Sequence, residues 1–303
     1  MADGSESSFV TVDGDRIYRR VFGARRRGPT LLCLHGGPGA THDYLRPLAD
    51  LTARGYRVAF YDALGCGRSD LPEGRERFTL AHDLTVLDAV RRSLGGRRIH
   101  LMGSSYGGLL ALAYATRHSD ELASLVSTGG LCDVPFASRE MARLVRALPI
   151  ATRRALRYYG ARGEYQHPAY EAAAMTFYHR HVCRLRPWPR ELEFSLLRMS
   201  RPVYETMNGP NEFTIVGNLR SIDFTRELGR IAVPTLLVHG RYDEVTPAVG
   251  ARIQRAIPGA RLAIFPKSSH VSFWEERPTY RALVGGFLKE ADGRGPASGA
   301  SSP

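Results

Sequence analysis

The chain has 303 residues, of which 43% are hydrophobic and 24% are charged, and its formal net charge at pH 7 is +12. This length suits one large core with an inserted subdomain, and the composition excludes a disordered or fibrous protein. The positive charge comes from arginines scattered along the chain and not from one focused patch, so we expect no nucleic-acid partner.

Several further classes of protein are excluded by local composition. No apolar stretch approaches the roughly 18 residues that suggest a membrane span, and the acidic, polar N-terminus does not resemble a secretory signal. The four cysteines are widely spaced and form no C-x-x-C pair, so neither a zinc site nor a disulfide framework is indicated. We therefore expect a cytoplasmic protein with no membrane partner.

Short apolar runs bounded by turn residues predict eight strands. The first two flank Asp13-Gly14, which is a hairpin signal, and most of the later runs are continuously apolar, as is typical of parallel strands covered on both faces. The expected strands are residues 9–12, 16–22, 30–34, 57–61, 99–102, 122–127, 235–238 and 261–265.

Helical patterns lie between most of these strands. An antiparallel hairpin followed by alternating strands and helices predicts a mostly parallel, doubly wound, eight-stranded sheet. The expected core helices are residues 42–53, 80–94, 106–118, 248–256 and 279–289.

The alternation stops between the sixth and seventh strands, where an arginine-rich and aromatic-rich interval carries three helical patterns split by prolines: 138–148, 170–183 and 191–199. We interpret this interval as a helical cap inserted into the core. The predicted division is a first core part at 1–132, the cap at 133–226, a second core part at 227–290 and a disordered tail at 291–303.

A Gly-x-Ser-x-Gly sequence follows the fifth predicted strand, with Ser105 at its centre. In α/β hydrolases this sequence forms a sharp turn that lifts a serine hydroxyl above the sheet, and the glycines let the strand and the following helix pack closely around it. Ser105 is therefore the candidate nucleophile, and with this turn the predicted fold is an α/β hydrolase with an inserted helical cap.

A serine nucleophile needs a histidine base and a carboxylate that orients the histidine. In this fold the chain order is serine, acid, histidine, with the last two on loops after late strands. Asp243 follows the strand 235–238 and His270 follows the strand 261–265. We predict the triad Ser105, Asp243 and His270.

Two backbone N–H groups are expected to bind the oxyanion. One belongs to Tyr106, directly after the nucleophile, and the other to the loop after the third strand. That loop is His35-Gly-Gly-Pro-Gly39, in which we select Gly37 as the donor and Gly36 as the weaker alternative. His35 is expected to pack beneath the loop and not to act as the base.

Five segments of the chain resemble the proline iminopeptidases, most closely the tricorn-interacting aminopeptidase branch, and the similarity spans about residues 8 to 290. The segments are His35-Gly-Gly-Pro-Gly39, Tyr61-Asp-Ala-Leu-Gly-Cys-Gly-Arg-Ser69, Gly103-Ser-Ser-Tyr-Gly-Gly108, Met207-Asn-Gly-Pro-Asn-Glu-Phe213 and Tyr242-Asp-Glu-Val-Thr-Pro247.

This resemblance implies a serine peptidase that hydrolyses short peptides at a free N-terminus. It implies that Glu212 and Glu244 bind the substrate ammonium, as two carboxylates near a nucleophile would favour a cation. Tyr204, shortly before that glutamate motif, is a candidate pocket residue, and packing within the cap accounts for it equally well. The chain has Tyr106 where the family commonly has tryptophan, so strict preference for proline is not implied.

The function expected from the sequence is therefore a serine aminopeptidase that releases proline or other, mostly apolar, N-terminal residues through an acyl-enzyme. It would need no metal or organic cofactor, and an upstream protease could supply its peptides. Two alternatives remain: an amino-acid amidase or esterase acting on a small natural product, and a non-catalytic binding protein with a hydrolase fold.

Overall fold

The computed structural model describes residues 4–96 and 98–293. Its centre is one eight-stranded sheet with the order β1-β2-β4-β3-β5-β6-β7-β8. The pairs β1–β2 and β2–β4 are antiparallel and the remaining pairs are parallel, which confirms the predicted sheet. The strands are β1 (Ser5–Val12), β2 (Asp15–Phe22), β3 (Thr30–Leu34), β4 (Arg57–Tyr61), β5 (Ile99–Ser104), β6 (Leu122–Thr128), β7 (Thr235–Gly240) and β8 (Arg261–Phe265).

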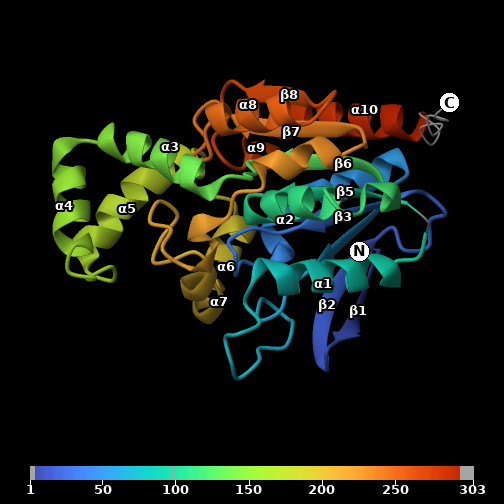
Figure 1. The fold of residues 1–303 in the computed structure, drawn as a ribbon, viewed down its shortest axis with the longest axis horizontal. Coiled ribbons are helices and arrows are strands. Elements are labelled where there is room, and N and C mark those ends of the chain that lie inside the picture. Colours follow the sequence, from blue (N-terminus) through green and yellow to red (C-terminus); the bar gives the residue numbers. More distant parts are fainter. Residues whose placement is uncertain (1–3, 97, 294–303) are drawn as a thin grey trace.

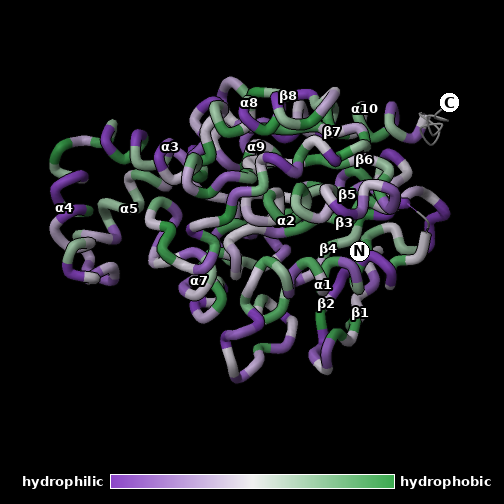
Figure 2. Tube along the Cα trace, in the orientation of Figure 1, coloured by the Kyte–Doolittle hydropathy of each residue, from purple (hydrophilic) through white to green (hydrophobic). Residues whose placement is uncertain are grey.

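Both faces of the sheet are covered, which explains why its central strands are continuously apolar. Successive side chains of a strand point to opposite faces, so Leu32 and Leu34 join one core cluster while Leu31 and Cys33 join the other. Figure 2 shows this hydrophobic interior along the central strands and the helix α2. The first cluster includes α1 (Leu80–Ser93), α2 (Tyr106–Ala115) and α8 (Pro247–Ala256), and the second includes the 3₁₀ segment η1 (His42–Arg54) and α10 (Arg277–Gly293).

Five helices follow one another between β6 and β7, in the interval where the sequence predicts a cap. Two of them, α4 and α5, project away from the sheet (Figure 1) and pack on each other through a small separate cluster around Phe177. The five helices are α3 (Val134–Arg146), α4 (Ile150–Gly160), α5 (Pro168–His181), α6 (Arg190–Leu197) and α7 (Arg201–Met207).

Two helix boundaries differ from the sequence predictions, and a few short elements complete the described chain. Helix α10 continues through Gly293, so residues 291–293, predicted as the start of a disordered tail, are helical; residues 294–303 lie outside the described residues. The first cap-like helical pattern begins earlier than predicted, because Asp133 caps α3 by accepting a hydrogen bond from the Phe136 N–H. The short elements are η2 (Ser119–Glu121), η3 (Asn218–Ser221), η4 (Thr225–Arg230) and α9 (Ser272–Glu275).

Candidate active site

Ser105 stands alone between the end of β5 and the start of α2, with φ 58° and ψ −124°. A non-glycine residue in this region is strained, and such strain concentrates at functional sites. The flanking glycines make the turn possible: a Cβ on Gly103 would lie 1.9 Å from the Gly107 carbonyl oxygen, and one on Gly107 would lie 2.4 Å from the Leu34 oxygen. The packing therefore presents the Ser105 hydroxyl at the carboxyl edge of the sheet.

Asp243 and His270 meet at the same edge, on the loops that follow β7 and β8. The Asp243 Oδ1 atom lies 2.6 Å from His270 Nδ1 and accepts a second hydrogen bond from the Val245 N–H at 2.9 Å. Both side chains are buried. This contact fixes the orientation of the imidazole, with Nδ1 toward the carboxylate and Nε2 on the opposite side.

Ser105 and His270 line one cavity of about 420 Å³. The buried Nε2 atom of His270 has no hydrogen-bond partner among residues 4–96 and 98–293, and Glu244 Oε1 lies 3.7 Å from it. The structure thus joins the acid to the histidine and places the serine in the same cavity without a serine–histidine hydrogen bond. Such contacts commonly tighten only when substrate is bound.

The charge on His270 is governed by its surroundings. Burial disfavours the imidazolium, but the carboxylates of Asp243, Glu244 and Glu212 outweigh it and raise the pKa of His270 to about 10. Without a bound cation, the imidazole therefore holds its proton at neutral pH.

The loop after β3 lies against the nucleophile. A Cβ on Gly36 would lie 2.7 Å from the Ser105 Cβ, so only glycine permits this approach. The Gly36 N–H already donates to the Tyr44 hydroxyl at 2.7 Å. This leaves Gly37, which lines the cavity with Ser105, as the stronger of the two sequence candidates. The Tyr106 N–H is at the first position of α2, where no intrahelical acceptor exists.

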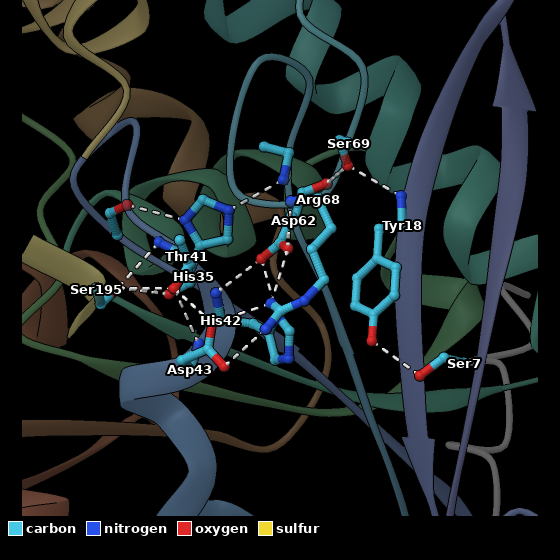
Figure 3. Close-up of polar contacts among 12 residues, drawn as sticks. Ser7, Tyr18, His35, Thr41, His42, Asp43, Asp62, Arg68, Ser69 and Ser195 are labelled. Atoms are coloured by element: carbon cyan, nitrogen blue, oxygen red, sulfur yellow. Dashed lines mark hydrogen bonds and ion pairs between the residues drawn. The ribbon is translucent and has the colours of Figure 1, made fainter. Parts of the chain in front are cut away.

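A buried polar network holds this loop on its other side (Figure 3). Asp62, after β4, accepts the His42 N–H at 2.8 Å and the Arg68 N–H at 3.0 Å. The Arg68 guanidinium donates to Asp43, which also accepts the Thr41 hydroxyl at 2.8 Å. The loop backbone is thereby fixed to the sheet, as an oxyanion donor must be.

The Tyr106 side chain is also buried, and its hydroxyl donates to Asp83 of α1 at 2.5 Å. Burial raises the pKa of the Asp83 carboxyl to about 7, against the opposing effect of the Tyr106 hydrogen bond. Tyr106 therefore ties the start of α2, and with it the nucleophile turn, to the neighbouring helix.

Glu212 reaches the site from the cap side. It stands on a tight turn after α7, held by Asn208, whose side-chain amide donates to the Asn211 carbonyl at 2.9 Å. The Tyr204 hydroxyl donates to Glu212 Oε1 at 2.8 Å. Tyr204 is buried, so the structure places it as a partner of this glutamate.

Glu244 reaches the site from the core, one residue after Asp243, and its backbone N–H donates to the His181 carbonyl of α5 at 3.2 Å. Burial is the main cause that raises the pKa of both glutamates, and for Glu244 the negative charge of Glu212 raises it further. Two carboxylates that repel each other, Glu244 buried and Glu212 partly buried, favour a bound cation that offsets their charge.

The sequence did not reveal three supporting residues: Tyr44, Asp83 and Ser195. Tyr44 contacts Gly36, Asp83 contacts Tyr106, and Ser195 contacts Thr41. None of the three stands in a recognisable motif. The Asx-like spacing of Asn208 and Asn211 around a glycine was the one local signal that the Glu212 turn is rigid. Within the described ranges, no three His, Cys, Asp or Glu side chains are grouped closely enough to hold a metal ion.

The comparisons with known proteins agree with this geometry. The family model described as the alpha/beta hydrolase fold matches residues 29–277. The proline iminopeptidase of Thermoplasma volcanium is 44% identical over 94% of this chain and 97% of its own length, and that of Saccharolobus solfataricus is 40% identical over 94% and 93%.

Two solved structures are similar over nearly their whole length. The crystal structure of VinJ has a TM-score of 0.92 at 35% identity and covers 94% of this chain and 99% of that chain. The proline iminopeptidase of Mycobacterium smegmatis has a TM-score of 0.88 at 34% identity and covers 95% and 99%. In residues 4–96 and 98–293, no helix combines the length and apolar character that a membrane crossing requires. With identity and coverage this high, the chain belongs to the proline iminopeptidase family of α/β hydrolases.

Proposed function

We propose that this protein is a serine aminopeptidase that releases proline, and other mostly apolar residues, from the free N-terminus of short peptides. The observation that carries the proposal is the pair of carboxylates, the buried Glu244 and the partly buried Glu212, in the cavity that holds Ser105. Within reach of a serine nucleophile they would bind an ammonium group and reject a blocked or anionic end.

In the proposed reaction, neutral His270 takes the proton from Ser105 Oγ as this oxygen attacks the carbonyl carbon of the first residue. Asp243 holds the imidazole and stabilises its charge. The N–H groups of Gly37 and Tyr106 donate to the oxyanion. His270 then gives its proton to the departing nitrogen, the peptide bond breaks, and an acyl-enzyme remains.

The second half of the reaction uses the same groups. His270 takes a proton from a water molecule, the hydroxide attacks the ester carbon, and the oxyanion again accepts hydrogen bonds from the two N–H groups. The proton passes to Ser105 Oγ as the ester bond breaks, which frees the N-terminal residue and restores the serine. Tyr204 supports both halves by orienting Glu212.

Replacement Ser105→Ala tests the nucleophile. We expect turnover of proline arylamide to fall at least about a thousand-fold, because loss of a triad member leaves only the catalysis due to binding and the oxyanion site. The far-ultraviolet circular dichroism should match that of the parent protein. Activity at the parental level would refute the mechanism.

The ammonium subsite is tested by comparing proline arylamide with its N-acetyl form. The acetylated compound lacks the positive charge and should be turned over at least about a hundred-fold more slowly. Equal rates would remove the proposed role of Glu212 and Glu244 and would favour a general amidase or esterase.

We also propose that the enzyme works in the cytoplasm on peptides released by an upstream protease. Support comes from the chemistry of the chain: its four cysteines are free and buried, as suits a reducing compartment, and a free-amine substrate is what earlier proteolysis produces. Fractionation and peptide profiling of a deletion strain would test both points.

A further inference from the structure

Two cavities meet at the nucleophile. Both are lined by Ser105, Gly37, Glu212 and Glu244, and their volumes are about 430 and 420 Å³. They differ in the groups of the proposed machinery that line them, because only the first is lined by Tyr106 and only the second by His270. The reacting centre therefore separates two unlike compartments.

We propose that the compartment lined by His270 is a subsite for the leaving group, and that it selects peptides whose second residue is apolar. This inference rests on the proposed aminopeptidase function. It specifies the second residue of the substrate, on the leaving-group side of the cleaved peptide bond, which the family resemblance does not describe.

The reaction itself assigns the two compartments. The departing nitrogen must receive its proton from His270 Nε2, so the residue attached to that nitrogen lies beside the histidine. The first residue then occupies the other compartment, whose wall includes Leu131, Met141 and Leu219. The two glutamates, common to both, flank the position of the first residue's amine.

The wall of the leaving-group compartment is apolar away from the reacting centre. It consists mainly of Leu192 and Leu196 of α6, Met199 after this helix, and Val271 beside the histidine. Among the described residues that line it, the titratable side chains are the buried phenol of Tyr44 and the groups that the reaction already uses, Glu212, Glu244 and His270. A negatively charged second residue would lose its hydration there, and the two glutamates would repel it.

The polar atoms in this wall are already engaged. Ser195 is buried, accepts the Thr41 N–H at 2.9 Å and donates its hydroxyl to the Thr41 carbonyl at 2.9 Å. The Tyr44 hydroxyl accepts the Gly36 N–H. The two bonds between Ser195 and Thr41 also attach α6 to the loop after β3 (Figure 3), so this part of the wall has a fixed position relative to the nucleophile.

The same helix offers a matched control. Leu196 lines the compartment and is partly buried, whereas Leu197, the next residue, is 87% exposed. Leu196→Ser and Leu197→Ser make the same chemical change on the two sides of α6, and only the first should alter the subsite.

The experiment measures kcat/KM for release of proline from the α-amides of prolyl-glycine, prolyl-leucine and prolyl-glutamate, with proline arylamide as the reference. We expect the parent enzyme to prefer leucine over glycine by about ten-fold or more and to disfavour glutamate, because a hydrophobic pocket discriminates by about this much per methylene or more. Leu196→Ser should reduce the leucine-to-glycine ratio at least about five-fold, and Leu197→Ser should leave it unchanged.

The outcomes separate the inference from the function beneath it. Equal rates for the leucine and glycine amides in the parent enzyme, with arylamide turned over, would overturn the subsite and leave the aminopeptidase standing. A leucine preference that survives in folded Leu196→Ser protein, or that is lost equally in Leu197→Ser, would overturn its assignment to α6. Failure to release proline from any amide or arylamide would refute the proposed function, and the subsite with it.

Discussion

The imidazole of His270 is under the influence of three carboxylates, those of Asp243, Glu244 and Glu212, and this environment determines when it can accept a proton. Its pKa is raised to about 10, so in the empty site the base form becomes common only at alkaline pH. A substrate ammonium between Glu212 and Glu244 would offset their charge and lower that pKa. Binding of the substrate ammonium would thus also convert His270 to the neutral form that acts as the base.

Glu244→Gln tests this dependence. The rate of inactivation by a neutral, serine-directed phosphonate should rise with pH until His270 is neutral, and the substitution should shift the rising limb to lower pH, because it removes a carboxylate that stabilises the imidazolium. The measurement is the inactivation rate constant between about pH 6 and about pH 10. An unshifted limb would mean that Glu244 does not act on His270.

At the scale of elements, the pair Tyr106–Asp83 joins α2 to α1 below the nucleophile. The pKa of Asp83 is raised to about 7, above the value near 3.9 of an unfolded aspartate. The folded state therefore holds this proton more tightly than the unfolded chain does. Its contribution to stability is present below about pH 4 and is lost as the pH rises toward about 7.

We expect Asp83→Asn to remove this loss. The fall in the free energy of unfolding between about pH 4 and about pH 8 should be smaller in the variant than in the parent by up to about 4 kcal/mol, the value of a three-unit pKa difference. Urea unfolding at the two pH values measures it, and equal pH dependence in both proteins would contradict the assignment.

A second pair of elements is joined at Ser195, whose hydroxyl connects α6 to the loop that carries Gly37. Ser195→Ala leaves the buried Thr41 N–H and carbonyl without this partner. We expect a loss of about 1–3 kcal/mol in the free energy of unfolding and a lower kcat.

Thr176→Ala is the matched control for Ser195→Ala, because the Thr176 hydroxyl donates only within α5, to the Ala172 carbonyl at 3.1 Å. Urea unfolding and steady-state kinetics of both variants provide the comparison. If Ser195→Ala behaves like Thr176→Ala, the cap does not support the oxyanion loop.

For the whole molecule, the sequence predicted what local patterns encode. The strands at 30–34, 57–61 and 261–265 coincide with β3, β4 and β8, because each is a short apolar run between turn residues. Helix α4 was missed, since Leu156 is its one buried side chain, and the large apolar side chains of Ile150 and Tyr158 are exposed. The predicted family and the sheet are confirmed, while the tricorn-interacting branch, the domain boundaries and the roles of the site residues stay predictions.

Contacts between distant segments could be predicted from the sequence only where a known fold template pairs them. Thr41 and Ser195 are 154 residues apart, and neither lies in a pattern that announces a partner. Asp243 and His270 are 27 residues apart and were paired by their order and their place after strands. The two cases differ because α/β hydrolases share a known chain order for the triad. No comparable pattern exists for the contacts between the cap and the core.

The two glutamates have different origins in the chain, since Glu212 comes from the insertion between β6 and β7 and Glu244 from the core. In the proposed function the triad lies wholly in the core, whereas amine recognition is divided between the core and the insertion. An ancestor could exchange the insertion and acquire a new substrate range while its nucleophile, acid and base stayed untouched. Divergence in this lineage should accordingly be faster in residues 134–217 than in the turns that hold the triad.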